Sequence, residues 1–414
     1  MRIVIVSRGK FPGYDGPARR VKYLGAGLAK NGCDVSLIVA YPPDPVPCGE
    51  EFVNTYGYRY DHTIQREQTD ATGFWKKLYY KLAGTARVYA SVARMQAAKP
   101  VDAMLLCGVG FVELFVASCI AWRFGIKLAV DKNDVNYRLK SRSRRSLYGL
   151  LSGINMALSE PLLNRRADVI FTVNTYLYDL YRKTARGRVR HIIPSFIDCR
   201  EIEKEQSGDD LFEHFDGVKF LSVVTTSYHL YGVIPFASAL ALLRDKVRFR
   251  LYLLCSQDPE TLEGVDRLLV EKDLKACSTI LTRVPPESAH SVYAGADIIL
   301  NAQQEPEIAE GGFPGKTAEI LASGTPIITT MFSDLHLCYV DGSNCLVVTY
   351  DDVASYVRAI SALCESAELR ERLGGEGRKT ALREFEYIRG TKQIKAEISD
   401  ALQSPPNRVD GESV

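Results

Sequence analysis

The segment Glu310–Pro326, with the sequence EGGFPGKTAEILASGTP, combines residue types that suit the binding of an anion. Three glycines flank Phe313 and remove side chains where a ligand would approach the backbone. Pro314 suits the first position of a helix, where a missing N–H loses no partner, and Gly324 suits the end of that helix. A helix that begins in this way directs N–H groups and a partial positive charge at an anion such as a phosphate. An ordinary turn before a core helix explains the same residues equally well.

Apolar strands and helices alternate in both halves of the chain around this segment. The alternation predicts an α/β fold with two Rossmann-like domains, each a doubly wound parallel sheet. A glycine-containing loop over residues 9–16 follows the first strand, and Pro17 begins a helix. The predicted strands are Ile3–Val6, Val35–Val39, Ala103–Leu106, Leu128–Val130, Val169–Val173, Arg190–Ile193, Phe220–Val224, Phe249–Leu254, Thr279–Leu281, Ile298–Leu300, Pro326–Thr329 and Cys345–Val348.

The apolar pattern gives way to charged and turn residues over 192–210, which predicts a domain boundary there. Ligands of parallel sheets bind beyond the carboxyl ends of the strands, where the 9–16 loop and the 310–319 loop both lie. We therefore expect the two domains to face a cleft that both loops line. The expected segments are a first domain over 1–195, a second domain over 196–386, a helix over 387–402 that packs back on the first domain, and a disordered polar tail over 403–414.

A chain of 414 residues with 46% hydrophobic and 25% charged residues is typical of a globular protein with two domains. Its apolar runs are strand-sized and its N-terminus leads directly into a strand, so we expect neither a membrane span nor a signal peptide. The ten cysteines are scattered without a CxxC pair, and the six histidines form no HExxH motif. These features predict reduced thiols in a cytoplasmic protein, and no metal or other cofactor.

The charge is distributed unevenly along the chain. Residues 1–195 carry 30 Lys and Arg against 15 Asp and Glu, whereas residues 196–414 carry 22 against 35. A basic first half suits a nucleic acid, an anionic membrane or an acidic substrate as a partner. Electrostatic attraction between two oppositely charged domains is the structural alternative.

Four segments together carry a resemblance to a known family. They are SRGKFPGYDGPARRVKYLGAGLAKNGCDVSLIVA at the start, ADVIFTVNTYLYDLY with VRHIIPSFID, GADIILNAQQEPEIAEGGFPGKTAEILASGTPII, and DGSNCLVV with the helix that ends in REFEY. Over nearly its whole length, the chain resembles family-4 glycosyltransferases of the GT-B fold. The resemblance implies sugar transfer from a nucleotide-sugar donor with retention of configuration and without a metal. It also implies that the first domain binds the acceptor and the second binds the donor.

The resemblance implies a donor site around the segment that begins at Glu310. The diphosphate would meet backbone N–H groups between Gly312 and Lys316. The carboxylate of Glu319 lies on the same helix face as Gly315 and would accept hydrogen bonds from the ribose hydroxyls, with a surface or capping role as the alternative. The predicted donor-binding residues are Gly311, Gly312, Phe313, Pro314, Gly315, Lys316, Thr317, Glu319, His229 and Tyr231.

The chain departs from the family at the glutamate that precedes the ribose-binding one by eight residues. Gly311 occupies that position here. Glu310 lies one residue further back, and an extra glycine that bulges the loop would return it to the site. Glu310 is therefore the predicted catalytic glutamate, with Glu307 and Glu305 as rival candidates.

A second departure lies in residues 225–232, TTSYHLYG, which lack the arginine and lysine with which the family binds the diphosphate. Tyr231 occupies the lysine position. Lys316, at the predicted start of the helix, and Arg19, in the first domain, are the predicted substitutes for the missing charge, while His229 and Tyr231 retain hydrogen-bond donors. A solvated surface side chain is the alternative for Lys316.

The first domain supplies two further candidate groups. In VDKNDVNY, Asn133 occupies the place of a family histidine near the sugar, and Asp131 and Asp134 flank the strand end where carboxylates of parallel-sheet enzymes lie. Asp134 is predicted to orient the acceptor or a sugar hydroxyl, or else to cap a helix. The small-residue loop Gly16, Pro17, Ala18 and Arg19 would let the donor phosphates or the acceptor approach the backbone, with a structural turn as the alternative.

Two basic stretches, 74–84 (FWKKLYYKLAG) and 137–149 (YRLKSRSRRSLYG), concentrate positive charge and aromatic residues. Such a combination suits an anionic membrane interface, and family members that act on lipid-linked acceptors agree with it. A solvated helix face above a core stripe is the alternative. No nucleic-acid motif is present, so we expect no nucleic-acid partner.

The sequence therefore predicts a glycosyltransferase that uses a nucleotide-sugar and a glycan, polysaccharide-precursor or lipid-linked acceptor. Its expected location is the cytoplasm, peripheral on the cytoplasmic face of the membrane. A GT-B-shaped subunit without catalysis, serving as a binding or scaffold partner, is the alternative that the altered glutamate pair and missing cations suggest. A nucleotide-sugar epimerase is a third interpretation.

Overall fold

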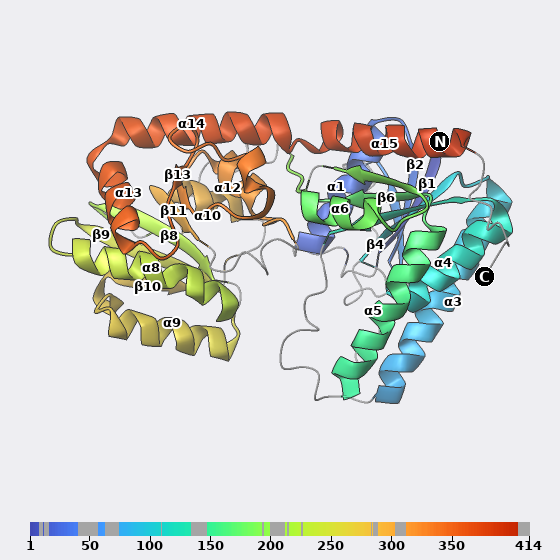
Figure 1. Ribbon diagram of the computed structural model, residues 1–414, viewed down its shortest axis with the longest axis horizontal. Coiled ribbons are helices and arrows are strands. Elements are labelled where there is room, and N and C mark those ends of the chain that lie inside the picture. Colours follow the sequence, from blue (N-terminus) through green and yellow to red (C-terminus); the bar gives the residue numbers. More distant parts are fainter. Residues whose placement is uncertain are drawn as a thin grey trace. The chain divides into compact units, whose positions relative to one another are not determined.

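The computed structural model describes residues 1–7, 11, 16–39, 57–62, 74–108, 110–133, 147–192, 194–198, 212, 215–224, 227–282, 284, 289–302 and 312–404, without the side chains of 60–62, 74–84, 147–156, 227–231 and 289–290. The chain forms two compact units (Figure 1). The first contains Met1–Phe196, Gly311–Phe313 and Tyr387–Val414, and the second contains Ile197–Glu310 and Pro314–Glu386. The short segment Gly311–Phe313 thus groups with the first unit, although the residues on either side of it belong to the second.

A parallel sheet of seven described strands, in the order β3-β2-β1-β4-β5-β6-β7, forms the centre of the first unit. The strands are β1 (Arg2–Ser7), β2 (Asp34–Val39), β3 (Arg59–His62), β4 (Ala103–Cys107), β5 (Lys127–Lys132), β6 (Val169–Thr172) and β7 (Arg188–His191). The helices are α1 (Gly16–Lys30), α3 (Phe74–Ala98), α4 (Phe111–Phe124), α5 (Leu147–Arg166), α6 (Thr175–Arg182) and α15 (Tyr387–Gln403).

Helices cover both faces of the first sheet. Helices α1 and α15 pack on one set of strand residues, which includes Ile3 and Ile5. Helices α3, α4, α5 and α6 pack on the intervening residues, which include Val4 and Val6. Because successive strand residues point to opposite faces, each buried strand supplies both apolar cores and reads as a continuous apolar run.

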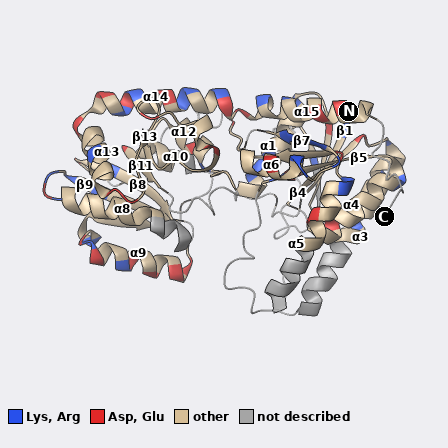
Figure 2. Ribbon diagram, viewed as in Figure 1, with Lys and Arg blue, Asp and Glu red and all other residues tan. Residues whose placement is uncertain are grey.

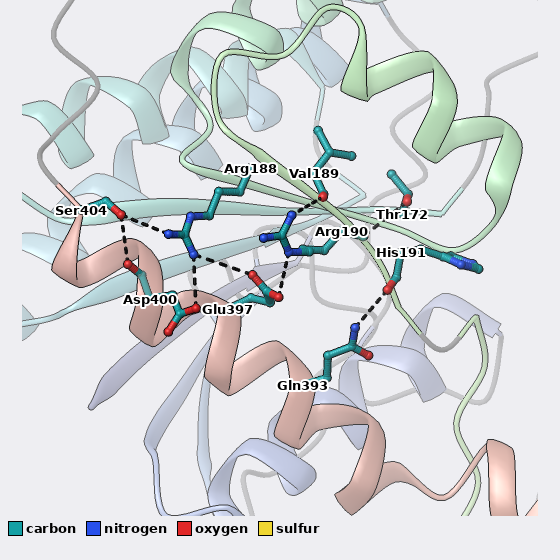
Figure 3. Close-up of polar contacts among 9 residues, drawn as sticks. All are labelled: Thr172, Arg188, Val189, Arg190, His191, Gln393, Glu397, Asp400 and Ser404. Carbon is teal, nitrogen blue, oxygen red and sulfur yellow. Dashed lines mark hydrogen bonds and ion pairs between the residues drawn. The ribbon is translucent and has the colours of Figure 1, made fainter.

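The last helix, α15, covers the edge strand β7. Arg190 Nε lies 2.8 Å from a carboxylate oxygen of Glu397, and Arg188 Nη1 lies 3.3 Å from one of Asp400 (Figure 3). Gln393 Nε2 donates a hydrogen bond to the backbone oxygen of His191 at 3.1 Å. These polar contacts join α15 to the edge strand β7 of the first sheet.

The second unit is built on a parallel sheet in the order β10-β9-β8-β11-β12-β13, with β8, α8 and β9 meeting in its apolar core. This order is that of a dinucleotide-binding sheet. Its strands are β8 (Val218–Val224), β9 (Phe249–Cys255), β10 (Ser278–Leu281), β11 (Ile298–Asn301), β12 (Ile327–Thr329) and β13 (Leu346–Val347). Its helices are α8 (Ser227–Leu243), α9 (Pro259–Glu271), α10 (Ala289–Gly295), α12 (Thr317–Ser323), α13 (Val353–Glu365) and α14 (Ala367–Glu384), with 3₁₀ turns at Lys275–Cys277 and Ser333–Leu337.

All twelve predicted strands are present, with ends that agree to within two residues. Strand β3 was not predicted, because its sequence RYDH contains no apolar run. The predicted helix start at Pro314 is wrong. Helix α12 begins at Thr317, and the amide of Thr317 bonds to the carbonyl oxygen of Pro314 at 3.0 Å, so residues 314–317 form a turn. Gly315, a poor helix former, follows the proline and favours the turn over another helical residue.

The contact of α14 with the end of α12 leads to a prediction about two adjacent glycines. A Cβ atom on Gly374 would overlap the carbonyl oxygen of Gly324, whereas one on Gly375 would meet no atom within 4 Å. We expect Gly374→Ala to lower the free energy of unfolding by about 1–3 kcal/mol, because backbone must move to admit the methyl group. We expect Gly375→Ala to raise it by up to about 1 kcal/mol, because alanine favours the helix. Urea denaturation measures both, and equal effects would contradict this packing.

Candidate active site

A buried ion pair joins helix α1 to strand β5 at the carboxyl edge of the first sheet. Arg20 Nε and Nη2 lie 2.8 Å from different carboxylate oxygens of Asp131. The two side chains keep 8% and 1% of their surface exposed. Arg20 Nη1 also donates to the carbonyl oxygen of Pro194 at 2.8 Å, and the guanidinium carbon lies 4.9 Å from the centroid of the Phe196 ring. The pair thus connects α1, β5 and the segment after β7.

The thiol of Cys107, at the end of β4, lies near this ion pair. Burial raises the pKa of Cys107 well above its usual value, the charge of Asp131 raises it further, and Arg20 opposes the shift. The thiol therefore stays protonated at neutral pH and does not supply a nucleophilic thiolate. The bidentate geometry of Arg20 and Asp131 neutralises both charges in this dry environment.

A second set of polar contacts lies at the end of β5. Lys132 Nζ lies 2.8 Å from Glu160 Oε1, and the Tyr181 hydroxyl donates to Glu160 Oε2 at 2.6 Å. Burial, followed by the charge and hydrogen bond of Glu160, raises the pKa of Tyr181, so its hydroxyl remains a donor. The next residue, Asn133, has a buried side-chain oxygen with no hydrogen-bond partner among the described residues. Such an oxygen is suited to accept a hydrogen bond from a ligand.

In the second unit, Glu319 lies in the first turn of α12 and keeps 7% of its surface exposed. An acidic residue at this place interacts favourably with the helix dipole, although α12 has only seven residues. Gly324 ends the helix in a left-handed conformation, with φ of 77°. The predicted end of this helix at Gly324 is therefore confirmed, whereas its start lies at Thr317 instead of Pro314.

The described residues among those predicted for the two loops lie at the start of α1 or in the turn before α12. Gly16 and Pro17 are exposed and begin α1, while Ala18 is buried and Arg19 is half-buried. Gly315 is exposed, and a Cβ atom on Gly16 or Gly315 would meet nothing within 4 Å. The backbone at Gly16 and at Gly315 therefore has open space on the side where a Cβ atom would lie. Gly312, Phe313, Pro314 and Lys316 are half-buried, and Thr317 is buried.

Several predicted residues cannot be placed. Glu305, Glu307, Glu310, Gly311 and Asp134 lie outside the described residues. The backbones of His229 and Tyr231 belong to α8, but their side chains also lie outside the description. Their proposed roles therefore rest on sequence.

Arg20 was missed, although the sequence contains a signal for it. Arg20 precedes Leu24 by four residues and Gly27 by seven, and all three are buried on the same face of α1. Helical spacing places Arg20 on the buried face of α1. A buried guanidinium requires a carboxylate as its partner. Asp131, which was considered a strand-end carboxylate for chemistry, is that partner.

One family match lies mainly in the second unit. Residues 240–396 match the family described as glycosyl transferase-like. The matched residues include α12 with Glu319 and both glycines of the α14 prediction.

The chain is 29% identical over 190 residues to a D-inositol 3-phosphate glycosyltransferase of Corynebacterium efficiens. That similarity covers 43% of this chain and 43% of the relative, so less than half of the curated relative is spanned. The predicted resemblance to glycosyltransferases is confirmed by these matches. Membership of family 4 and retention of configuration stay predictions.

Solved structures share the fold. Sucrose-phosphate synthase of Thermosynechococcus elongatus has a TM-score of 0.69 at 16% identity, with 98% of this chain and 100% of that one covered. HepE of Anabaena, solved in complex with UDP, has a TM-score of 0.67 at 13% identity, with 97% and 100% covered. The predicted GT-B class, with two Rossmann-like parallel-sheet domains, is confirmed.

The described residues contain no metal-binding cluster and no membrane-spanning helix. No three His, Cys, Asp or Glu side chains in these parts of the chain gather in a way suited to a metal ion. Among the helices that the structure describes, none combines the length and apolar character that a membrane crossing requires.

Proposed function

We propose that this protein is a glycosyltransferase that moves a sugar from a nucleotide-sugar donor to a glycan or lipid-linked acceptor. The observation that supports this function best is the buried carboxylate of Glu319, which follows the glycine-rich turn. Both lie within the residues that match the glycosyl transferase-like family. The complex of HepE with UDP supports a nucleotide donor for a chain of this fold. Retention of configuration and independence of metals are parts of the proposal that derive from the family resemblance.

The donor half of the proposed site uses the segment from Gly312 to Glu319. The backbone of the turn binds the diphosphate, and Lys316 adds positive charge where the leaving group becomes negative. Glu319 accepts hydrogen bonds from the ribose. Glu310 acts near the transferred sugar, with Glu307 and Glu305 as alternatives.

The acceptor half of the proposed site uses the carboxyl edge of the first sheet. Asn133 and Asp134 orient the acceptor or a sugar hydroxyl, and Asn133 offers the buried amide oxygen described above. The loop Gly16 to Arg19 admits the acceptor or the donor phosphates to the backbone. The buried pair of Arg20 and Asp131 fixes the strand end from which Asn133 extends.

A panel of ligands tests the proposed function. Calorimetric titration of the full chain with UDP, GDP and their sugar conjugates should give saturable binding to one base without added metal. Addition of a glycan or lipid-linked acceptor should then release the nucleoside diphosphate, measured by coupled phosphatase assay. Binding without release under any acceptor would favour the scaffold alternative, and interconversion of the nucleotide-sugar without an acceptor would favour an epimerase. Absence of binding to every nucleotide would refute the proposal.

The proposed location is the cytoplasmic face of the membrane, and its sequence basis lies in the two basic stretches. Residues 137–146 lie outside the described residues, as do the side chains of 74–84 and 147–149. Those stretches therefore provide no structural support.

A further inference from the structure

The helices α3, α4 and α5 form a layer whose outer surface exposes large apolar side chains. Trp122 keeps 80% of its surface exposed, Phe115 52%, Leu158 48% and Tyr89 40%. All four residues lie on these three helices of the first unit. Single exposed apolar residues are common on protein surfaces, but four on one layer, two of them on α4, require an explanation.

Helix α4 has two apolar faces. Leu114, Ala117 and Ile120 are buried in the core against the sheet. Phe115, Cys119 and Trp122 follow the helical spacing of four and three residues on a different face, and all three are exposed. The ring of Phe111, a half-buried residue one turn earlier, lies 6.1 Å from that of Phe115. An apolar face on the solvent side of a helix is unusual, because such helices normally have only a core-facing apolar side. The second apolar face of α4 has no packing partner among the described residues.

The neighbouring helices continue this surface. The ring of Tyr89, on α3, lies 6.3 Å from the ring of Phe124, on α4. Leu158 is exposed on α5, which also contacts α4. The core-facing residues of α3 and α5, such as Val88 and Leu163, are buried against the same sheet face. The exposed aromatic and aliphatic side chains therefore belong to the outer side of one helical layer.

The charges of this layer are almost all positive. The three helices contain eight Lys and Arg but only two Asp and Glu. Figure 2 colours the charged residues in the described parts of these helices. Glu113 is buried and accepts from the amide of Gly110, and Glu160 pairs with Lys132. The exposed charged residues among those described on the layer are Arg87, Arg94, Arg123, Arg165 and Arg166.

We infer that the outer face of α3, α4 and α5 docks on the surface of an anionic bilayer. Tryptophan and tyrosine are favoured at the boundary of headgroups and acyl chains, and arginine binds the phosphate of acidic lipids. Charge complementarity therefore selects an anionic lipid surface as the occupant. The inference deepens the proposed function by placing a lipid-linked acceptor near the first unit. It does not depend on sugar transfer, because vesicle binding is measured without donor or acceptor.

Vesicle sedimentation of the full chain tests the inference. We expect binding to vesicles of phosphatidylcholine with 30% phosphatidylglycerol at roughly physiological salt, and much weaker binding to phosphatidylcholine alone, because acidic lipid attracts the arginines. Phe115→Ala with Trp122→Ala should weaken binding to the anionic vesicles by at least about tenfold. Leu242→Ala is the matched control, since Leu242 on α8 is 66% exposed in the second unit, and it should bind as the native chain does.

Fluorescence gives a local measurement on the same face. The chain has two tryptophans, so Trp75→Phe leaves Trp122 as the single emitter. Its emission should shift to the blue and become protected from acrylamide when anionic vesicles are added. Unchanged emission, or equal vesicle binding by the double variant, would overturn the inference. Light scattering that shows a dimer in the native chain and a monomer in the double variant would also overturn it, since the face would then be an interface between two copies.

Discussion

Replacing Asp131 by alanine is expected to lower the free energy of unfolding by about 3–5 kcal/mol, because it leaves a buried guanidinium without its carboxylate. Arg20 keeps 8% of its side-chain surface exposed, so water cannot replace the lost partner. The hydrogen bond to the Pro194 carbonyl remains but supplies no opposite charge. Urea denaturation, followed by circular dichroism, measures the change, and a loss below about 1 kcal/mol would contradict the burial of the pair.

Two further variants separate the ion pair from a general sensitivity of the first unit. Arg20→Met combined with Asp131→Ala removes both charges and should recover most of the loss, which gives a large coupling energy in the double-mutant cycle. Asp179→Ala is the control, since Asp179 pairs with Arg182 at 3.3 Å at an exposed site of the first unit. Its cost should be at most about 1 kcal/mol. A double variant as unstable as Asp131→Ala alone would mean that packing, rather than charge, explains the effect.

Most strands of both sheets could be predicted, because a strand that is buried on both faces is a continuous apolar run in the sequence. Runs such as Ile3–Val6 and Ile298–Leu300 are apolar without interruption, and such runs are confined to strands covered on both sides. Strand β3 has no such run, and its place at the sheet edge depends on pairing with β2. Edge strands of this kind are specified by tertiary contacts, which local patterns do not contain.

The site was harder to predict than the fold. The glycines and Glu319 are recognisable by spacing, but the start of α12 was placed at Pro314 on the preference of proline for the first helical position. The structure instead uses Pro314 as the acceptor of a turn that ends at Thr317. The pair of Arg20 and Asp131 joins residues 111 positions apart, and α15 joins the first unit from beyond the second. Such long-range partners depend on the topology of the fold. Helical spacing indicates which face of a helix is buried, but it does not determine which distant residue that face contacts.

Replacing Glu319 by alanine is expected to weaken the binding of the preferred nucleoside diphosphate by at least about 100-fold. Each hydrogen bond to an ionised carboxylate contributes about 1.5–3 kcal/mol, and the ribose offers two hydroxyls. Calorimetric titration measures the loss, with circular dichroism to verify that the variant is folded. Glu376→Ala is the matched control, because Glu376 is also a helical glutamate of the second unit. Its carboxylate pairs with Lys379 on the surface. It should bind the nucleotide as the native chain does.

Deoxy ligands distinguish a ribose contact from a structural role of the buried Glu319. The native chain should prefer the nucleoside diphosphate over its 2′-deoxy and 3′-deoxy forms, because each lacks one hydroxyl donor. Glu319→Ala should bind all three ligands with nearly equal, weak affinity, since the group that discriminates among them is gone. A variant that is weaker but still prefers the ribose by the native factor would show that Glu319 supports the fold of α12 and that another residue binds the sugar. The ratio of affinities, rather than the loss itself, therefore decides the role of this carboxylate.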